Sequence, residues 1–144
     1  MTTQKTLQFL TKDDEQLLDQ HTQSLSYKAE QVVLKEGERR QAIFHIESGL
    51  CRVEKDHLGQ GIAVAHLGPG EIFGEISYLE GGAATASVVT EEDATIRVLD
   101  GVYLQSLLES VPGLSSRFYR SLAVMLANRL KQTTRLVVAP FSWG

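Results

Sequence analysis

Apolar and polar positions divide the chain into a helical beginning, a β-structured middle and a helical end. Near the beginning, Thr11 precedes several acids and then Leu17, Leu18 and His21, which is the pattern of a short helix capped by a threonine. Between residues 27 and 95, short alternating runs are separated by glycine-containing turns. Such spacing is typical of a small barrel or jelly roll and not of an α/β sheet. The expected strands cover residues 27–34, 42–46, 50–54, 62–67 and 94–99.

The residues after the last expected strand predict two helices. Asp100 is a plausible cap for a short helix over Val102–Leu108, which Pro112 interrupts. A second helix is expected from Pro112 to near Leu136, because apolar residues recur there at every fourth position. These apolar residues are Leu114, Phe118, Leu122, Leu126 and Leu130. The stripe suits packing either on the β structure alone or also on a second copy of the same helix.

The stretch 73–78, Phe-Gly-Glu-Ile-Ser-Tyr, is the most informative part of the β-structured middle. Gly74 predicts a close approach of the backbone to a ligand at the start of a short helical turn. The first amides of a helix have no internal partner, and a phosphate is a common ligand there. Glu75 is expected to accept a hydrogen bond from a ligand hydroxyl, and Thr85 to donate one to a phosphate.

Two motifs resemble the cyclic nucleotide-binding domain, which catabolite-activator proteins, protein kinase A regulatory subunits and cyclic-nucleotide-gated channels share. F-G-E-I-S-Y, with A-T-A-S-V following at 84–88, is similar to that family's phosphate-binding cassette. Gly37-Glu38, residues 43–46 and Gly49 match its second signature at the family spacing. The resemblance covers roughly residues 17–130. It implies a mainly β fold with flanking helices: a double-stranded β-helix (jelly-roll) barrel with an N-terminal helix and a C-terminal helical lid.

The resemblance also implies a division of the chain and a ligand. The division is 1–22, an N-terminal helical segment; 23–99, a β-roll with the cassette at 68–90; 100–137, the C-terminal helices; and 138–144, a tail or linker. The ligand is a cyclic mononucleotide whose identity the residues do not reveal. Its expected binding residues are Phe73, Gly74, Glu75, Ile76, Ser77, Ala84, Thr85, Ala86, Val64, Ala65 and Arg129, with the amides of 84–86 included.

Two of these residues have alternative interpretations. Glu75 is expected to recognise the ribose 2′-hydroxyl, but it could instead neutralise the orphan amides of the helical turn. Ala84 stands at the position of the arginine that binds the cyclic phosphate in the resembled family. Losing a charge-assisted contact costs about 1.5–3 kcal/mol. Arg129 on the last helix is the candidate replacement, and its alternative is a place on a solvated helix face.

Composition narrows the function classes. The chain has 144 residues, 14 basic and 18 acidic, so a general nucleic-acid binder is not expected. An apolar run long enough to span a membrane is not found, and the one cysteine, Cys51, predicts a reducing cytoplasmic setting without internal disulfides. Four histidines lack metal-ligand spacing, and Ser77 lacks legible catalytic partners. We therefore expect neither an enzyme nor a metal or other cofactor. The histidines are His21, His45, His57 and His66.

The residues leave two principal functions open. One is a cyclic-nucleotide sensor module that transmits binding through its last helix, with a homodimer formed by that helix and an output domain outside this chain. The other is a degenerate fold that serves as a dimerisation or interaction scaffold without nucleotide. A nucleoside or a cyclic dinucleotide also remains a possible ligand. Specific DNA binding by this chain alone is not expected, because a helix-turn-helix would have to follow the last helix.

Overall fold

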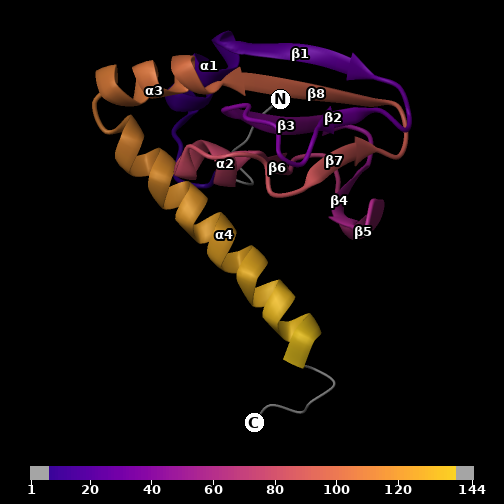
Figure 1. Cartoon of the computed structure of the whole chain (residues 1–144). Coiled ribbons are helices and arrows are strands. Elements are labelled where there is room, and N and C mark those ends of the chain that lie inside the picture. Colours follow the sequence, from indigo (N-terminus) through magenta and orange to yellow (C-terminus); the bar gives the residue numbers. More distant parts are fainter. Residues whose placement is uncertain (1–6, 139–144) are drawn as a thin grey trace.

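The computed structural model describes residues 7–138, with side chains as far as residue 135, and shows a β-roll flanked by helices (Figure 1). Within this range, no helix is both long and apolar enough to span a membrane. In chain order the elements are α1 (Lys12–Gln20), β1 (Thr22–Tyr27), β2 (Val32–Leu34), β3 (Ala42–Ser48), β4 (Cys51–His57), β5 (Gln60–Leu67), β6 (Ile72–Phe73), α2 (Glu75–Glu80), β7 (Ser87–Thr90), β8 (Ala94–Asp100), α3 (Gly101–Ser110) and α4 (Leu114–Val138).

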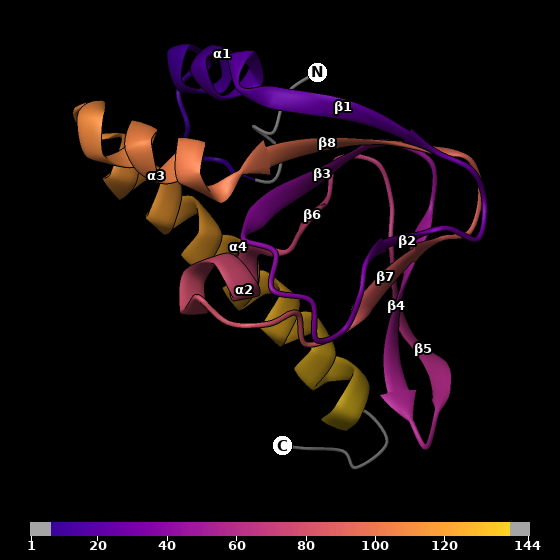
Figure 2. The ribbon, with the colours of Figure 1, turned by 45° about the horizontal axis from the view of Figure 1, so that its top comes forward.

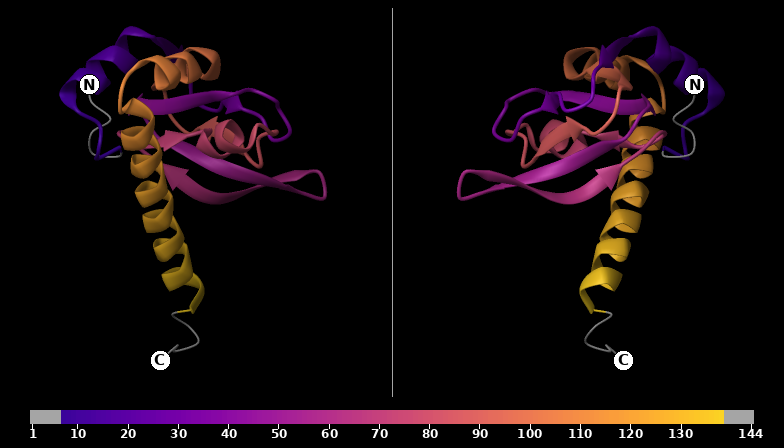
Figure 3. Two further views of the ribbon diagram at one scale, coloured as in Figure 1. Left: turned by 90° about the vertical axis from the view of Figure 1, so that its left-hand side faces the viewer. Right: turned by 90° about the vertical axis from the view of Figure 1, so that its right-hand side faces the viewer.

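The strands form two four-stranded antiparallel sheets. One sheet has the order β1-β8-β3-β6 and the other the order β2-β7-β4-β5, so strands distant in the sequence are neighbours in both (Figure 2). This is the mainly β, jelly-roll architecture with flanking helices that the sequence predicts. Helices α1 and α3 lie at one end of the roll, and α4 runs past the sheets as a long rod (Figure 3).

Strand β3 separates two hydrophobic cores, because its successive side chains point to opposite faces. Phe44 and Ile46 belong to the core between the sheets, where the Phe44 ring stacks on Phe73 with a centroid distance of 4.8 Å. Ile43 faces the other way, into a core that the helices complete with Leu104 and Phe118. Both faces of β3 are therefore buried, which explains its nearly continuous apolar sequence.

Helix α1 is joined to α4 by a buried carboxylate. Thr11 and Asp14 form a capping box, which confirms the predicted threonine cap. Arg117 of α4 donates two hydrogen bonds to Asp14, from Nε to Oδ2 at 2.6 Å and from Nη2 to Oδ1 at 2.8 Å. The guanidinium holds the pKa of Asp14 below its usual value. One carboxylate thus caps α1 and fixes it to α4.

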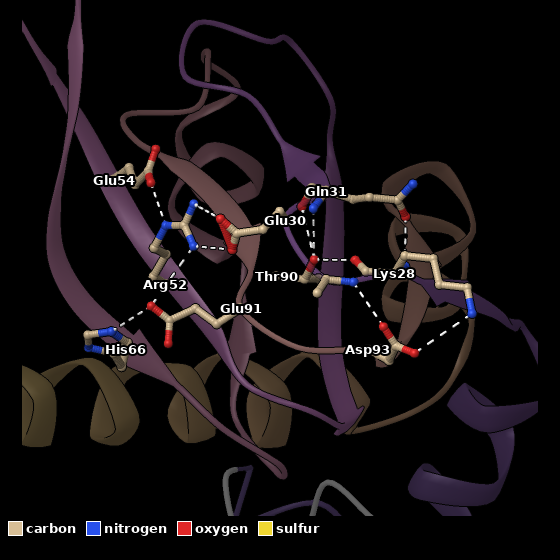
Figure 4. Close-up of polar contacts among 10 residues, drawn as sticks. Lys28, Glu30, Gln31, Arg52, Glu54, His66, Thr90, Glu91 and Asp93 are labelled. Carbon is tan, nitrogen blue, oxygen red and sulfur yellow. Dashed lines mark hydrogen bonds and ion pairs between the residues drawn. The ribbon is translucent and has the colours of Figure 1, made fainter.

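The prediction of one continuous strand over 27–34 was wrong. The chain turns between β1 and β2, and Glu30 adopts a left-handed conformation with φ 65°. The buried hydroxyl of Thr90 holds this turn: it accepts from the Gln31 amide at 2.9 Å and donates to the Lys28 carbonyl at 2.6 Å (Figure 4). A long-range partner therefore bends a segment whose local pattern favours extension.

The helix predictions after the roll were confirmed with small changes at the ends. Asp100 caps α3, because its side chain accepts a hydrogen bond from the Val102 amide at 2.8 Å. Helix α4 begins at Leu114 and extends to Val138, slightly beyond the expected end. Apart from Val138, the expected tail lies outside the described residues.

We expect Asp14→Asn to lower the free energy of unfolding by about 1–3 kcal/mol at neutral pH, because a charge-assisted, largely buried pair is lost. A depressed pKa contributes stability that is fully present above the ordinary carboxyl pKa, and this contribution is lost as the pH falls below that value and through the lowered pKa of the folded state. The deficit of the variant should therefore shrink in acid. Urea unfolding across pH measures it, with Asp13→Asn, an exposed neighbour on α1, as the control. A deficit of equal size at every pH would contradict the assignment.

Candidate ligand-binding site

The turn between β6 and α2 can be built only with glycine at position 74. Gly74 has φ 84°, a left-handed conformation that side chains disfavour. A Cβ at this position would also lie 2.7 Å from the Phe44 ring and 2.9 Å from the Ala42 carbonyl oxygen. The glycine therefore lets the chain turn tightly over the inter-sheet core and places Glu75 at the first position of α2.

A cavity of about 240 Å³ opens beside this turn. Its walls come from the inner face of the roll, from the start of α2, from the loop before β7 and from α4. The lining residues are Leu34, Val53, Ala65, Leu67, Phe73, Gly74, Glu75, Ile76, Ser77, Ala84, Thr85, Ala86, Val88 and Arg129. The structure thus gathers ten of the eleven predicted binding residues around one cavity.

The exception is Val64, which does not line the cavity and is 61% exposed. The pairing of β4 with β5 shifts at this point: Val53 lies opposite Ala65 and Glu54 opposite Ala63. Val64 is the extra residue of this irregularity, so its side chain leaves the alternation that directs Ala65 into the cavity. A register shift of this kind leaves no clear mark in the sequence.

Glu75 and Arg129 form an ion pair between the cavity and the last helix. Arg129 donates from Nη1 to Glu75 Oε1 at 2.7 Å and from Nη2 to the Ile72 carbonyl oxygen at 2.6 Å. Glu75 is only 4% exposed. Arg129 therefore reaches the site, as hypothesised, and does not lie on a solvated face. Its immediate partner is the carboxylate and a main-chain carbonyl.

Burial sets the protonation behaviour of Glu75. Desolvation raises the pKa of Glu75 above its usual value, because the charged form loses hydration. The Arg129 guanidinium and the residue's own backbone N–H oppose this rise only in part. The ionised form of Glu75 is therefore energetically unfavourable in this position. A hydrogen bond from a ligand hydroxyl would stabilise it.

The amides of 84–86 are not equivalent. The Ala84 N–H donates to the Glu38 carbonyl oxygen at 2.9 Å, so this amide already has an acceptor within the chain. The neighbouring amides of Thr85 and Ala86 have no acceptor among the hydrogen bonds of the described residues. Two main-chain donors at the cavity wall are therefore free to meet an anion.

A second hollow, of about 570 Å³, lies at the corner of α1, β3 and α3. It is lined by His21, Arg40 and Tyr103, among other residues, and the rings of His21 and Tyr103 stack there. It contains neither the left-handed glycine, nor a deeply buried carboxylate, nor the free amides of 85 and 86. The smaller cavity therefore has the stronger chemical case as a ligand site.

A family model supports the same assignment. The model of the cyclic nucleotide-binding domain matches residues 24–111. The chain belongs to the cyclic nucleotide-binding domain family. The matched region includes every cavity-lining residue except Arg129, which α4 adds from beyond its end.

Individual relatives agree with this membership. The chain is 33% identical to cyclic GMP-binding protein C of Dictyostelium discoideum over 130 residues, which cover 84% of this chain and 5% of that protein. It is 36% identical to the cyclic AMP receptor protein of Thermus thermophilus over 101 residues, 69% of this chain and 45% of that protein. The chain therefore spans less than half the length of either relative, and both bear the names of nucleotide-binding proteins.

Solved structures show the same fold. The Thermus thermophilus catabolite activator protein superposes with a TM-score of 0.74 at 31% identity, covering 92% of this chain and 61% of that one. A cyclic nucleotide-binding domain from Methylobacillus flagellatus superposes with a TM-score of 0.83 at 23% identity, covering 99% and 85%. The latter identity supports the fold alone.

Sequence reasoning missed the apolar side of the cavity. Leu34 and Val88 come from β2 and β7, which pair with each other, and Val53 comes from β4. Each residue is an ordinary strand position in the sequence, so only its inward alternation could have indicated a role. The strand pairing that places them on one wall is long-range and has no local signal.

We expect Arg129→Met to raise the pKa of Glu75 further, because the buried carboxylate loses its charged partner. The free energy of unfolding should fall by about 1–3 kcal/mol at neutral pH. A carboxyl whose folded pKa is raised destabilises the fold while ionised, so the deficit should diminish as the pH falls and Glu75 takes up a proton. Carboxyl-carbon NMR titration and unfolding at several pH values measure both effects.

Arg135→Met is the matched control, because Arg135 lies exposed on the same helix. If the two arginine variants titrate alike and lose equal stability, the ion pair has no special role in holding the carboxylate.

Proposed function

We propose that the chain is a cyclic-nucleotide-binding sensor module whose last helix transmits the binding event. The observation that carries this proposal is the Glu75–Arg129 ion pair, because it connects a ligand-facing carboxylate directly to α4. The 68–90 segment would serve as the phosphate-binding cassette within the roll. Membership of the family and the free amides beside the cavity support the same assignment.

The donors and acceptors of the cavity suit the three parts of a cyclic mononucleotide. Glu75 would accept a hydrogen bond from the ribose 2′-hydroxyl, and the amides of Thr85 and Ala86 would donate to the cyclic phosphate. The apolar wall of Val53 and Ala65 would contact the base. The names of the relatives include both a cyclic GMP-binding protein and a cyclic AMP receptor, so both purine nucleotides are candidate ligands.

Transmission would arise from competition for one carboxylate. A ribose hydroxyl on Glu75 takes a hydrogen-bonding position beside the Arg129 guanidinium, so the ligand changes the free energy of the contact that holds α4. A ligand shifts a conformational equilibrium only by its difference in affinity for the two states. Nucleotide binding would therefore favour a different population of α4 positions.

The outer part of α4 would also form a homodimer. Leu122 and Met125 are buried within the chain, but Leu130, which continues the same apolar stripe, is 67% exposed. The C-terminal end of α4 extends away from the sheets (Figure 3), where a second copy could pack on it. We propose that an output domain outside this chain uses the movement, and that the module alone neither binds DNA specifically nor catalyses a reaction.

The principal alternative is a degenerate module that keeps the fold without binding nucleotide. The observation that favours it is Ala84, which leaves the phosphate region without the charged side chain of the family. In that case α4 would serve only as a dimerisation or interaction element. Affinity for nucleotide decides between the two functions.

We expect isothermal titration calorimetry to show saturable binding of cyclic GMP or cyclic AMP, and Glu75→Gln to weaken it. Loss of one charge-assisted hydrogen bond costs about 1.5–3 kcal/mol, which corresponds to roughly one to two decades of affinity. Glu80→Gln, an exposed change on the same helix, should leave the affinity unchanged. Absence of heat with cyclic AMP, GMP, CMP and UMP, all at millimolar concentration, would favour the scaffold.

We expect nucleotide to change hydrogen exchange in residues 126–138 of α4 as well as in the cavity. Arg129→Met should show the altered exchange of α4 even without nucleotide, because the link to Glu75 is already broken. Exchange followed by mass spectrometry measures both effects. Protection confined to the cavity, with α4 unchanged on saturation, would remove transmission through this helix while leaving nucleotide binding intact.

A further inference from the structure

Lys55 connects the β4–β5 hairpin to the loop that lines the cavity. Its Nζ donates a hydrogen bond to the Thr85 carbonyl oxygen at 2.6 Å. Thr85 and Ala86 both line the cavity, whereas Lys55 approaches from outside it. A lysine from a distant strand therefore contacts the main chain of the residues that carry the two free amides.

The contact fixes the orientation of one peptide group. The described chain has no cis peptide bonds, and in a trans peptide the carbonyl and the following N–H point in opposite directions. Because Lys55 holds the Thr85 carbonyl, the Ala86 N–H is directed to the other side of the same peptide. An ammonium on the carbonyl oxygen also polarises the peptide and strengthens its N–H as a donor.

The cavity lining offers an anion no unpaired cationic side chain. Among the described residues that line the cavity, Arg129 is the one cation, and Glu75 neutralises it. Ala84 contributes no charge. Lys55 therefore provides a positive charge in contact with the backbone of this loop, on the carbonyl of the same peptide group that carries the Ala86 N–H.

The charge of Lys55 is partly balanced by Glu36, whose Oε2 lies 3.5 Å from Nζ. Glu36 also accepts a hydrogen bond from the Asp56 amide at 2.9 Å, which holds it beside the hairpin. The Lys55 side chain is 55% exposed, so salt should screen its effect on an anion in the cavity. The contribution of Lys55 to the affinity for an anion is consequently expected to be modest and to depend on ionic strength.

We propose that Lys55 is a positioning residue for the phosphate: it orients the Thr85–Ala86 peptide and supplies through it the positive field that Ala84 does not provide. This inference rests on the proposed nucleotide-binding function. It accounts for how the cavity could hold an anion although the arginine position of the family is occupied by a methyl group.

The test compares dissociation constants of cyclic GMP and cyclic AMP for the wild type, Lys55→Met and Lys55→Arg at low and high salt. Lys55→Met should weaken binding about three- to tenfold at low salt and less at high salt, because the lost interaction is screened. Lys55→Arg should restore most of the affinity. Guanosine and adenosine, which lack the phosphate, should lose no affinity in Lys55→Met.

Lys28→Met is the matched control, since Lys28 is an exposed lysine that pairs with Asp93 and not with the loop. Glu36→Gln keeps an acceptor beside Lys55 but removes the opposing charge, so it should tighten binding about two- to threefold at low salt. Lys55→Met should weaken nucleotide binding and Glu36→Gln should strengthen it. These opposite changes in affinity distinguish an electrostatic effect from a general loss of folding.

Three results would contradict the proposal, and they distinguish the role of Lys55 from the proposed nucleotide-binding function. If the wild type binds nucleotide but Lys55→Met binds it with equal affinity and equal salt dependence, the role of Lys55 is overturned and the sensor function stands. If Lys55→Met loses nucleoside and nucleotide affinity in the same proportion, Lys55 is merely structural. If the wild type binds no cyclic nucleotide at millimolar concentration, both proposals fall.

Discussion

The ion pair between Glu75 and Arg129 is the interaction on which the organisation of the site depends. A carboxylate this deeply buried needs a partner, because an isolated buried charge is strongly unfavourable. Arg129 is provided by α4, an element separated from α2 by the remainder of the roll. The Arg129 contact that holds α4 to the roll is therefore also the contact that holds the cavity-lining carboxylate of Glu75.

The surrounding structure keeps that carboxylate in place. Gly74 turns the chain over the stacked rings of Phe44 and Phe73, so the start of α2 rests on the inter-sheet core. The opposite core, which Phe118 and Leu122 help to form, anchors the first half of α4. The second half of α4 has no buried residue within 126–135, and Arg129 holds this half to the roll. An element that is firmly packed at one end and held by a polar contact at the other fits the transmission proposed for α4.

In the proposed phosphate site, main-chain groups would take over part of a task that the resemblance to the family assigns to an arginine side chain. The free amides of Thr85 and Ala86 line the cavity next to Ala84, and the Lys55 ammonium contacts this loop from outside the cavity. Such an arrangement distributes positive field over peptide dipoles and leaves the cavity wall largely apolar. The expected consequence is weaker and more salt-dependent recognition of phosphate than an arginine would give.

The sequence alone determined the features that depend on local pattern: the capped α1, the glycine-separated strands of a jelly roll, the glycine and acid of the cassette, and the apolar stripe of α4. Only the tertiary structure decided that the chain bends at Glu30, that Val64 leaves the cavity, that the Ala84 amide is already engaged, and that Arg129 and Lys55 approach the site. The physical reason is that the first group rests on side-chain periodicity and intrinsic backbone preference, which neighbouring residues reveal. The second rests on strand register and on hydrogen bonds between residues 20 to 60 positions apart, which only the packed chain brings together.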